Sequence, residues 1–424
     1  MPEGIAEGIG ASVRRKEDKK YTTGKGRYTD DIKRDGQLYA FFVRSNVAHA
    51  TIKKIDVSKA LTCDGVAAIY TGDDIAADGV GGPICGWVPT NRDGSAPKEP
   101  PHPLLARSKV RYVGDHIAVV IAESLEQARS AAEKITIDLD VLPPVVDLST
   151  AIGNTQIHDE MDDNIYFDWE LGDESATASA LESAAKIVEL TVTNNRVIPN
   201  AIEPRAAVAE YNETNESFTL YTTSQNPHLT RLVMAAFMLQ IPESKLHVVA
   251  PDVGGGFGSK IYIYPEEAVC TWATKKLRRP IKWAAERSEA FLGDAHGRDH
   301  VNKVKVGLDQ NNKIVGLRVD TLANLGAYLS AFSMVTPTYL HGTLLSGCYN
   351  IPAIYTNVKG VCTTTVNVDA YRGAGRPEAT YLLERTMDYA ARQVGMDPAE
   401  FRRINFIPKD AFPYQTAVAL QYDV

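Results

Sequence analysis

The sequence predicts an α+β protein of more than one domain, and three observations support this prediction. The chain has 424 residues, of which 44% are hydrophobic and 23% charged, as is usual for a soluble globular protein with an ample core. Short apolar runs typical of strands are mixed with helical patterns along its whole length. A polar, acidic and irregular stretch near residues 149–174 suits a linker. We therefore divide the chain into an N-terminal arm, a first domain, a linker and a second domain, at residues 1–20, 21–147, 148–180 and 181–424.

Charge and composition argue against several function classes. A net charge of -8 disfavours a surface for nucleic acid or anionic membranes. No apolar run approaches the roughly 20 residues of a membrane helix, and the N-terminus lacks the pattern of a secretory signal. The five cysteines are scattered, which suits free thiols in a reducing cytoplasm. They do not supply four thiolates at iron–sulfur spacing, so we expect a cytoplasmic protein with any such cluster on another chain.

The first domain combines short strands with two helices. A glycine- and proline-rich stretch from residue 78 to residue 103 predicts a long loop. One helix is expected to start near Asp56 or Ser58, and an alanine-rich pattern predicts another over residues 124–134. We interpret His49 as a structural histidine. The strand candidates are residues 38–44, 65–70, 110–113, 117–121 and 135–139.

The second domain shows the same mixture. Residues 228–239 are expected to form an apolar helix, and residues 265–277 form one that begins with acids and ends with bases, as the helix dipole favours. A hairpin is predicted over residues 304–319. His296 and His300 have the spacing of two ligands on a helix, but Gly297 and a following strand pattern argue against a metal pair. Further strand candidates are residues 187–192, 202–207, 218–223 and 246–250.

A glycine-rich turn, GGGFGSK at residues 254–260, follows the last of these strands. It fails the phosphate-loop pattern because Ser259 separates Gly258 from Lys260. It also fails the dinucleotide pattern, since neither register places glycine at the sixth position. The turn, called the glycine loop below, is therefore a backbone-donor loop of another kind or a tight turn between a strand and a helix.

A second unusual segment is AYRGAGRPE at residues 370–378. Glycines let backbone N–H groups approach a ligand, and arginines present planar donors that suit oxyanions. A helix expected to begin near Pro377 would add a positive dipole end. The alternative is a surface loop with two solvated arginines. Residues 370–376 are called the arginine loop below.

Together with TSQNPH at residues 223–228, these segments resemble three motifs of the molybdenum-binding large subunit of the xanthine dehydrogenase and aldehyde oxidase family. The glycine loop is similar to its glycine-phenylalanine-glycine loop, the arginine loop to its arginine loop, and Gln225 to the glutamine beside the metal. The resemblance covers essentially the whole chain. It implies an α/β hammerhead domain at residues 21–147 and the first part of a molybdopterin-binding domain at residues 181–424.

The resemblance also implies roles for individual residues. Gln225 would hydrogen-bond a metal-bound oxygen, and the backbone of Phe257 and Gly258 would donate to another oxygen and the dithiolene. The arginine loop would close over the metal and the pterin, with Arg372 and Gln225 supporting catalysis. No side chain is expected to ligate the metal, because the pterin holds it. The expected cofactor-binding residues are Gln225, Gly256, Phe257, Gly258, Ala370, Tyr371, Arg372, Gly373 and Ala374.

The implied reaction is oxidative hydroxylation of an aldehyde or an aromatic N-heterocycle, with oxygen from water. The implied cofactor is a molybdenum–molybdopterin in its cytosine dinucleotide form. Electrons would pass to [2Fe-2S] clusters and FAD on an iron–sulfur subunit and an FAD subunit, in a dimer of heterotrimers. We expect no nucleic-acid partner and no membrane span.

Departures from the family pattern narrow these expectations. The arginine loop lacks the copper-binding cysteine of carbon monoxide dehydrogenases, so the chain resembles their copper-free relatives. Ile261 follows Lys260 where purine-oxidising members carry glutamate, which argues against xanthine.

The general-base glutamate of the family is expected beyond Val424, and neither Glu203 nor Glu378 matches its motif. We therefore expect that this chain alone does not turn over substrate. Either a second polypeptide supplies the missing C-terminal half, or the chain is a fragment. One alternative is a truncated or remnant chain that keeps the fold as a non-catalytic or interaction protein. A nucleotide-binding dehydrogenase is a further alternative, suggested only by the glycine loop.

Overall fold

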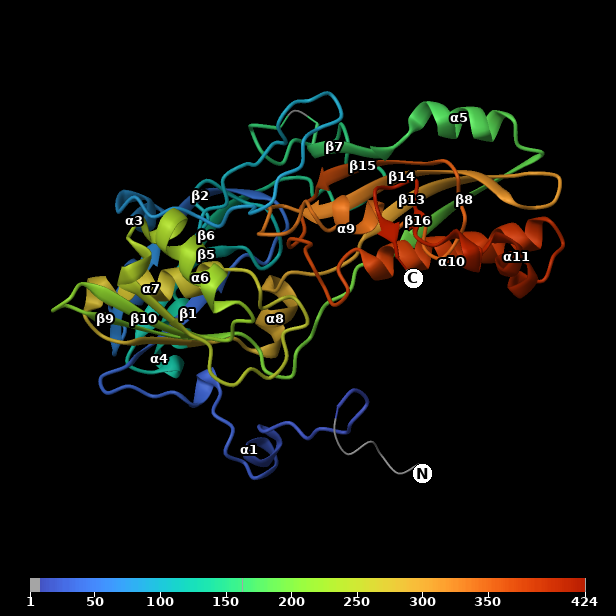
Figure 1. Ribbon diagram of the computed structural model, residues 1–424. Helices are drawn as coiled ribbons and strands as arrows, with labels where there is room; N and C mark the ends of the chain where they lie inside the picture. Colours follow the sequence, from blue (N-terminus) through green and yellow to red (C-terminus); the bar gives the residue numbers. More distant parts are fainter. Residues whose placement is uncertain (1–7, 162, 424) are drawn as a thin grey trace.

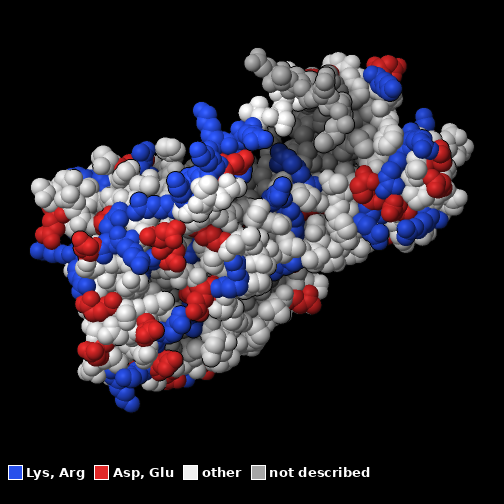
Figure 2. Space-filling view, turned by 90° about the horizontal axis from the view of Figure 1, so that it is seen from below, with Lys and Arg blue, Asp and Glu red and all other residues white. Residues whose placement is uncertain are grey.

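A computed structural model describes residues 8–161 and 163–423. Its two lobes are each built around one sheet (Figure 1). Positive and negative side chains are mixed over the face seen in Figure 2. Among the described residues, no helix is both long enough and apolar enough to cross a membrane.

A seven-stranded sheet organises the first lobe. Helices α6 (Pro227–Val233) and α7 (Pro265–Leu277) lie on one face and α4 (Leu125–Ala132) on the other (Figure 1). Every residue of the strand β5 is buried, because both faces are covered. In spatial order the strands are β11 (Leu246–Val249), β10 (Ser217–Thr222), β9 (Ala206–Asn212), β12 (Ile281–Ala284), β1 (Leu38–Arg44), β5 (His116–Ala122) and β3 (Val66–Thr71).

This sheet joins strands from both halves of the sequence. Strand β1 pairs with β5 in antiparallel fashion and with β12 in parallel fashion, with Leu38 opposite Ile281. The two domains that we divided at the linker therefore share one sheet. A smaller sheet of β4 (Lys109–Val110), β2 (Ala50–Asp56) and β6 (Thr136–Val141) belongs to the first half alone.

A five-stranded sheet organises the second lobe. Helix α5 (Glu174–Glu182) covers one face, and α10 (Arg376–Gln393) and α11 (Pro398–Asn405) lie on the other (Figure 1). Strands β13 and β14 form the predicted hairpin. The spatial order is β7 (Ile165–Gly172), β15 (Ile354–Cys362), β14 (Ile314–Gly326), β13 (His300–Leu308) and β8 (Lys186–Asn194).

Short elements complete the described chain. The remaining α-helices are α1 (Asp18–Thr22), α2 (Ser58–Leu61), α3 (Gly72–Ala77), α8 (Arg287–Gly293) and α9 (Tyr339–Gly342). Strands β16 (Tyr414–Gln415) and β17 (Gln421–Tyr422) pair with each other. Single 3-10 turns occur at η1 (Thr29–Asp31), η3 (Glu243–Lys245) and η4 (Lys409–Ala411).

Several predicted elements require correction. The predicted linker, residues 148–180, is not irregular, because it contains β7 and most of α5. Its Tyr166 and Phe167 are buried and anchor β7 on the sheet, which the acidic residues around them obscured. The predicted helix at residues 228–239 becomes α6 followed by a π-helical segment, η2 (Met234–Leu239).

Two predicted strands differ in their bounds from what was expected, one by being shorter and one by starting later. The strand candidate at residues 110–113 reduces to β4, and the one at residues 202–207 starts only at Ala206. The predicted helix over residues 265–277 is confirmed as α7, and the arginine loop leads into α10 as expected.

Candidate functional site

The three predicted motifs meet at one cavity of about 340 Å³. Gln225 comes from the end of β10, the glycine loop follows β11, and the arginine loop precedes α10. Of the nine predicted binding residues, all except Gly256 line the cavity, and Ile261 lines it as well. The lining residues are Gln225, Phe257, Gly258, Ile261, Ala370, Tyr371, Arg372, Gly373 and Ala374.

Gln225 is fixed by the glycine loop on both its backbone and its side chain. Its N–H donates to the carbonyl oxygen of Lys260 at 2.8 Å, and its Oε1 accepts the N–H of Gly258 at 2.9 Å. Asn226 then caps α6 by accepting the N–H of Leu229. The amide oxygen thus orients the side chain, and the amide nitrogen has no hydrogen-bond partner among the described residues. The Gly258 N–H, which we expected to face the cofactor, is used in this contact.

The glycine loop needs glycine because other backbone approaches it closely. Gly258 has φ +107, and an added Cβ would lie 2.3 Å from the Ala370 carbonyl oxygen. At Gly256 an added Cβ would lie 2.2 Å from Oε1 of Gln225. Gly256 therefore acts on the cavity by leaving room for Gln225.

The glycine loop and the arginine loop are also hydrogen-bonded to each other. The Arg372 N–H donates to the Phe257 carbonyl oxygen at 2.9 Å. The Arg372 guanidinium lies 6.0 Å from the centre of the Phe257 ring, which is 40% exposed at the cavity. The two loops therefore form one wall rather than two independent flaps.

Lys260 and Glu203 form a buried pair behind this wall. Lys260 Nζ donates to the Glu203 carbonyl oxygen at 2.7 Å and to Oε2 at 3.0 Å, and the same Oε2 accepts the Gly254 N–H at 2.7 Å. Burial lowers the pKa of Lys260, and the Glu203 carboxylate opposes that shift. These contacts give Glu203 a role in holding the loop.

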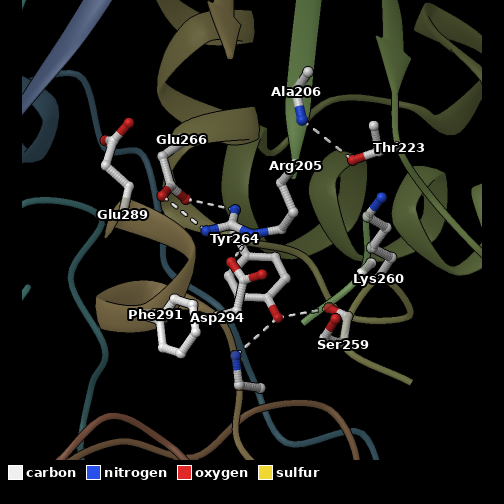
Figure 3. Close-up of polar contacts among 12 residues, drawn as sticks. Arg205, Ala206, Thr223, Ser259, Lys260, Tyr264, Glu266, Glu289, Phe291 and Asp294 are labelled. Carbon is white, nitrogen blue, oxygen red and sulfur yellow. Dashed lines mark hydrogen bonds and ion pairs between the residues drawn. The ribbon is translucent and has the colours of Figure 1, made fainter. Parts of the chain in front are cut away.

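A cluster of buried charges lies beside Ser259 and Lys260, at the end of the glycine loop (Figure 3). Arg205 donates to Asp294 at 2.6 Å and to both oxygens of Glu266 at 3.0 Å each. The Arg205 guanidinium stacks 3.6 Å from the centre of the Tyr264 ring, whose hydroxyl donates to the Ser259 carbonyl oxygen at 2.6 Å (Figure 3). The charges thus connect to the loop through Tyr264. The Arg205 cluster comprises Arg44, His116, Arg205, Tyr264, Glu266, Glu289 and Asp294.

Burial raises the pKa of Glu266, but Arg205, His116 and Arg44 outweigh it and hold that pKa well below its usual range. Burial, with help from Arg44, lowers the pKa of His116 to about 4. Glu266 is therefore ionised and His116 neutral at neutral pH. The Arg205 cluster was missed in the sequence because its members come from five separate segments and no local pattern links them.

The cavity offers donors that suit a large, electron-rich group. The N–H groups of Phe257, Tyr371 and Gly373 have no hydrogen-bond partner among the described residues, and all three residues line the cavity. The Gln225 amide nitrogen adds a fourth donor. Because glycines leave the backbone bare on this wall, these residues fit an organic metal-bearing cofactor held by backbone donors.

Comparisons with known proteins agree with this geometry. The sequence pattern of the molybdopterin cofactor-binding domain matches residues 157–406. That of the aldehyde oxidase and xanthine dehydrogenase a/b hammerhead domain matches residues 23–143. Both matches confirm the predicted fold class.

Three relatives illustrate the similarity. The carbon monoxide dehydrogenase large chain of Hydrogenophaga pseudoflava is 36% identical over 96% of this chain and 51% of its own. The nicotinate dehydrogenase large molybdopterin subunit of Eubacterium barkeri is 30% identical over 90% of this chain and 85% of its own. The crystal structure of quinoline 2-oxidoreductase from Pseudomonas putida 86 superposes with a TM-score of 0.90 at 31% identity, over 99% of this chain and 53% of that one.

The chain thus spans about half the length of the carbon monoxide dehydrogenase and quinoline enzymes, and most of the nicotinate dehydrogenase subunit. The two matched patterns together cover most of the described fold, from residue 23 to residue 406 with a gap at residues 144–156. The chain belongs to the family of molybdenum-binding large subunits of xanthine dehydrogenase and aldehyde oxidase.

Proposed function

We propose that this chain builds the metal-facing wall of the active site in a molybdenum hydroxylase. The observation that carries the proposal is the cavity at which Gln225, the glycine loop and the arginine loop meet, lined by free backbone donors. The substrate class is an aldehyde or an aromatic N-heterocycle, hydroxylated with oxygen from water. When bound, the molybdenum–pterin group supplies the two-electron oxidation at carbon.

The residues of this chain bind and orient that group. The Gln225 amide nitrogen and the Phe257 N–H donate from the side of the glycine loop, and the Tyr371 and Gly373 N–H groups donate from the arginine loop. The ring of Phe257 shields the cavity from water. Arg372 is a supporting residue whose guanidinium stays exposed near that ring.

The cavity lining supports the choice of substrate class. It contains no thiol, so a copper site for carbon monoxide is not proposed. Ile261 lines the cavity where the purine-oxidising pattern has glutamate, which leaves an apolar wall that suits a heteroaromatic ring. The relatives named for quinoline and for nicotinate act on such rings.

The remaining parts of the enzyme are proposed as partners. A second polypeptide, or further sequence, supplies the general-base glutamate and the rest of the cofactor surface. The relative named as a large molybdopterin subunit supports a split arrangement, because this chain spans 85% of it. An iron–sulfur subunit with [2Fe-2S] clusters and an FAD subunit accept the electrons, in a cytoplasmic dimer of heterotrimers with the cytosine dinucleotide form of the cofactor.

Molybdenum content tests the proposal most directly. The chain is purified from its own host with all copurifying polypeptides, and metal and released nucleotide are measured. About one molybdenum per chain with cytidine nucleotide is the expected result, followed by oxidation of aldehydes or N-heterocycles. No molybdenum, under conditions that load other molybdoenzymes of the same host, would favour a remnant that keeps the fold without the chemistry.

A further inference from the structure

Arg298 is a buried arginine that hydrogen-bonds to the arginine loop, and it has no part in the proposed function above. The residue lies just before β13, and only 8% of it is exposed. Its guanidinium donates to the carbonyl oxygens of Tyr371 at 3.2 Å and Arg372 at 2.8 Å, and to Oε1 of Glu378 at 3.1 Å. It also lies 4.8 Å from the centre of the Tyr371 ring. One planar fork therefore fixes two successive carbonyls and the first turn of α10.

Holding these carbonyls decides where the neighbouring N–H groups point. The peptide bonds of the arginine loop are trans, so each N–H points away from the C=O of its own peptide unit. The Arg372 carbonyl shares a unit with the Gly373 N–H, and the Ala370 carbonyl shares one with the Tyr371 N–H. Arg298 holds the first carbonyl, and the Tyr262 hydroxyl holds the second at 2.6 Å.

The two residues that carry these N–H groups lie at the cavity. Tyr371 and Gly373 both line it, and their N–H groups have no partner among the described residues. Between them, the Arg372 N–H donates to the Phe257 carbonyl oxygen and ties the loop to its neighbour. All three carbonyls are held, and of the three N–H groups only that of Arg372 has a partner among the described residues, so the other two remain as donors.

The segment that carries Arg298 is shaped to allow this approach. An added Cβ at Gly297 would lie 2.4 Å from the Tyr371 Cβ, so only glycine lets the two backbones come this close. Arg298 and Asp299 have φ +67 and +68, a left-handed conformation that non-glycine residues keep only when their surroundings hold them. Arg196 holds Asp299 at 2.7 Å from the other side.

We propose that Arg298 is a positioning residue that, together with Tyr262, turns the N–H groups of Gly373 and Tyr371 into the cavity, where they donate to oxygen atoms of the bound group. This inference rests on the proposed function for the identity of that group. A purely structural arginine would only neutralise Glu378, one of whose carboxylate oxygens is buried without a partner among the described residues.

The test compares Arg298→Lys with Arg111→Lys in the complex purified from the native host. Lysine at position 298 keeps the charge beside Glu378 but cannot span two carbonyls. Arg111 is the matched control because its guanidinium also donates to a backbone carbonyl, that of Ile157, and to the Tyr328 hydroxyl, and among the described residues it bonds to no part of the arginine loop or of the segment that carries Arg298. The readouts are amide hydrogen exchange at Arg372 and Ala374, whose N–H groups are bonded in the native loop, and molybdenum retained per chain after gel filtration.

Arg298→Lys is expected to speed exchange at both amides at least ten-fold and to lower molybdenum retention at least three-fold, with exchange in α10 beyond its first turn unchanged. Arg111→Lys is expected to change neither readout. Equal behaviour of the two variants would overturn the proposal, and so would faster exchange with full molybdenum retention, which would make Arg298 purely structural.

Tyr262→Phe provides a second route if Arg298→Lys does not fold. It removes only the hydroxyl that holds the Ala370 carbonyl, and the ring keeps its packing among Tyr264, Ala295 and Ala331. The same two readouts should move in the same direction by a smaller factor, and wild-type values would overturn the proposal. If the wild-type chain carries no molybdenum, the proposed function fails, and hydrogen exchange alone decides whether Arg298 holds the loop.

Discussion

Arg205 lies beside the end of the glycine loop and Arg298 beside the arginine loop, with exposed fractions of 1% and 8%, yet their partners differ. Arg205 meets the carboxylates of Glu266 and Asp294, each within 3.0 Å. Arg298 meets one carboxylate and two backbone carbonyls. The first arginine balances charge inside the core, whereas the second one sets the direction of peptide groups at the cavity. Burial alone therefore does not tell a stabilising arginine from a positioning one.

The largest expected effect breaks the charge balance of the Arg205 cluster. Glu266→Gln leaves Arg205 and Arg44 without their shared carboxylate, so the free energy of unfolding should fall by about 3–5 kcal/mol. Urea unfolding followed by tryptophan fluorescence measures this, because Trp283 lies 5.1 Å from the Arg205 guanidinium.

Glu289→Gln is the control for this variant, since Glu289 meets only Arg44 in the cluster, with Oε1 3.2 Å from both Nε and Nη2, and its loss should cost about 1 kcal/mol. Equal unfolding midpoints for the two variants would contradict the charge-balancing role that distinguishes Arg205 from Arg298.

The next largest effect tests whether a substitution at Gly258 only strains the backbone or also disrupts the contact between the glycine loop and the arginine loop. In Gly258→Ala the new Cβ would press on the Ala370 carbonyl oxygen. Gly258→Ala should lower the free energy of unfolding by about 1–3 kcal/mol more than the control variant Gly79→Ala, and it should lose most of its molybdenum. Gly79→Ala is the matched control, because Gly79 has φ +72 with nothing within 4 Å of an added Cβ. It should cost about 1–2 kcal/mol and leave molybdenum content unchanged. Full molybdenum content in Gly258→Ala would contradict the close contact of the loops.

A smaller effect tests the donor that the glycine loop orients. Gln225→Ala removes the amide at the cavity and one hydrogen bond from Gly258. Stability should fall by about 0.5–1.5 kcal/mol, and the hydroxylation rate by about ten-fold or more, equivalent to about 1.4 kcal/mol in the barrier. Steady-state assays with the substrate that the native complex oxidises measure this change. His228→Ala, an exposed position on α6, is the control, and equal rates for both variants would exclude a catalytic role for Gln225.

The smallest expected effect is a pH dependence of the free energy of unfolding, with opposite signs for His116 in the Arg205 cluster and for Glu378 beside Arg298. Unfolded His116 binds a proton below about 6.5 and the folded protein only near a pKa of about 4, so the free energy of unfolding falls as the pH drops from 6.5 to 4. Burial raises the pKa of Glu378 above 4.5, against the pull of Arg298. The contribution of Glu378 to the free energy of unfolding therefore falls as the pH rises past 4.5.

Urea unfolding between pH 4 and 8 distinguishes these two signs. His116→Gln should gain stability relative to wild type as the pH falls, and Glu378→Gln should gain as it rises. One proton limits each slope to about 1.4 kcal/mol per pH unit. Parallel profiles for both variants and the wild type would contradict the assigned protonation states.

The sequence predicts what is local. Gln225, the glycine loop and the arginine loop could be found because each is a short segment whose residue types restrict its backbone. Helix α7 and the β13–β14 hairpin could be predicted for the same reason, since their boundaries depend on charges and turns close in sequence.

What depends on distant partners could not be predicted. Arg298 meets Tyr371 across 73 residues and Arg205 meets Asp294 across 89. Locally, the region of Arg298 is marked only by its two histidines, and Gly297 reads as a helix breaker, although in the fold it makes room for Tyr371. Acidic residues flank the buried aromatics of β7, so the local sequence predicts a linker there, and only pairing with β15 makes the segment a strand.

The shared seven-stranded sheet has a consequence for how the chain is made. Leu38 pairs with Ile281, which is 243 positions later in the chain. At a synthesis rate of about 5–20 residues per second, β1 therefore waits roughly 12–50 s on the ribosome before β12 exists. During that interval the β1 edge is open to pairing with another chain. The hammerhead half is thus the part of the nascent protein most in need of chaperone protection, even though it is the first to be synthesised.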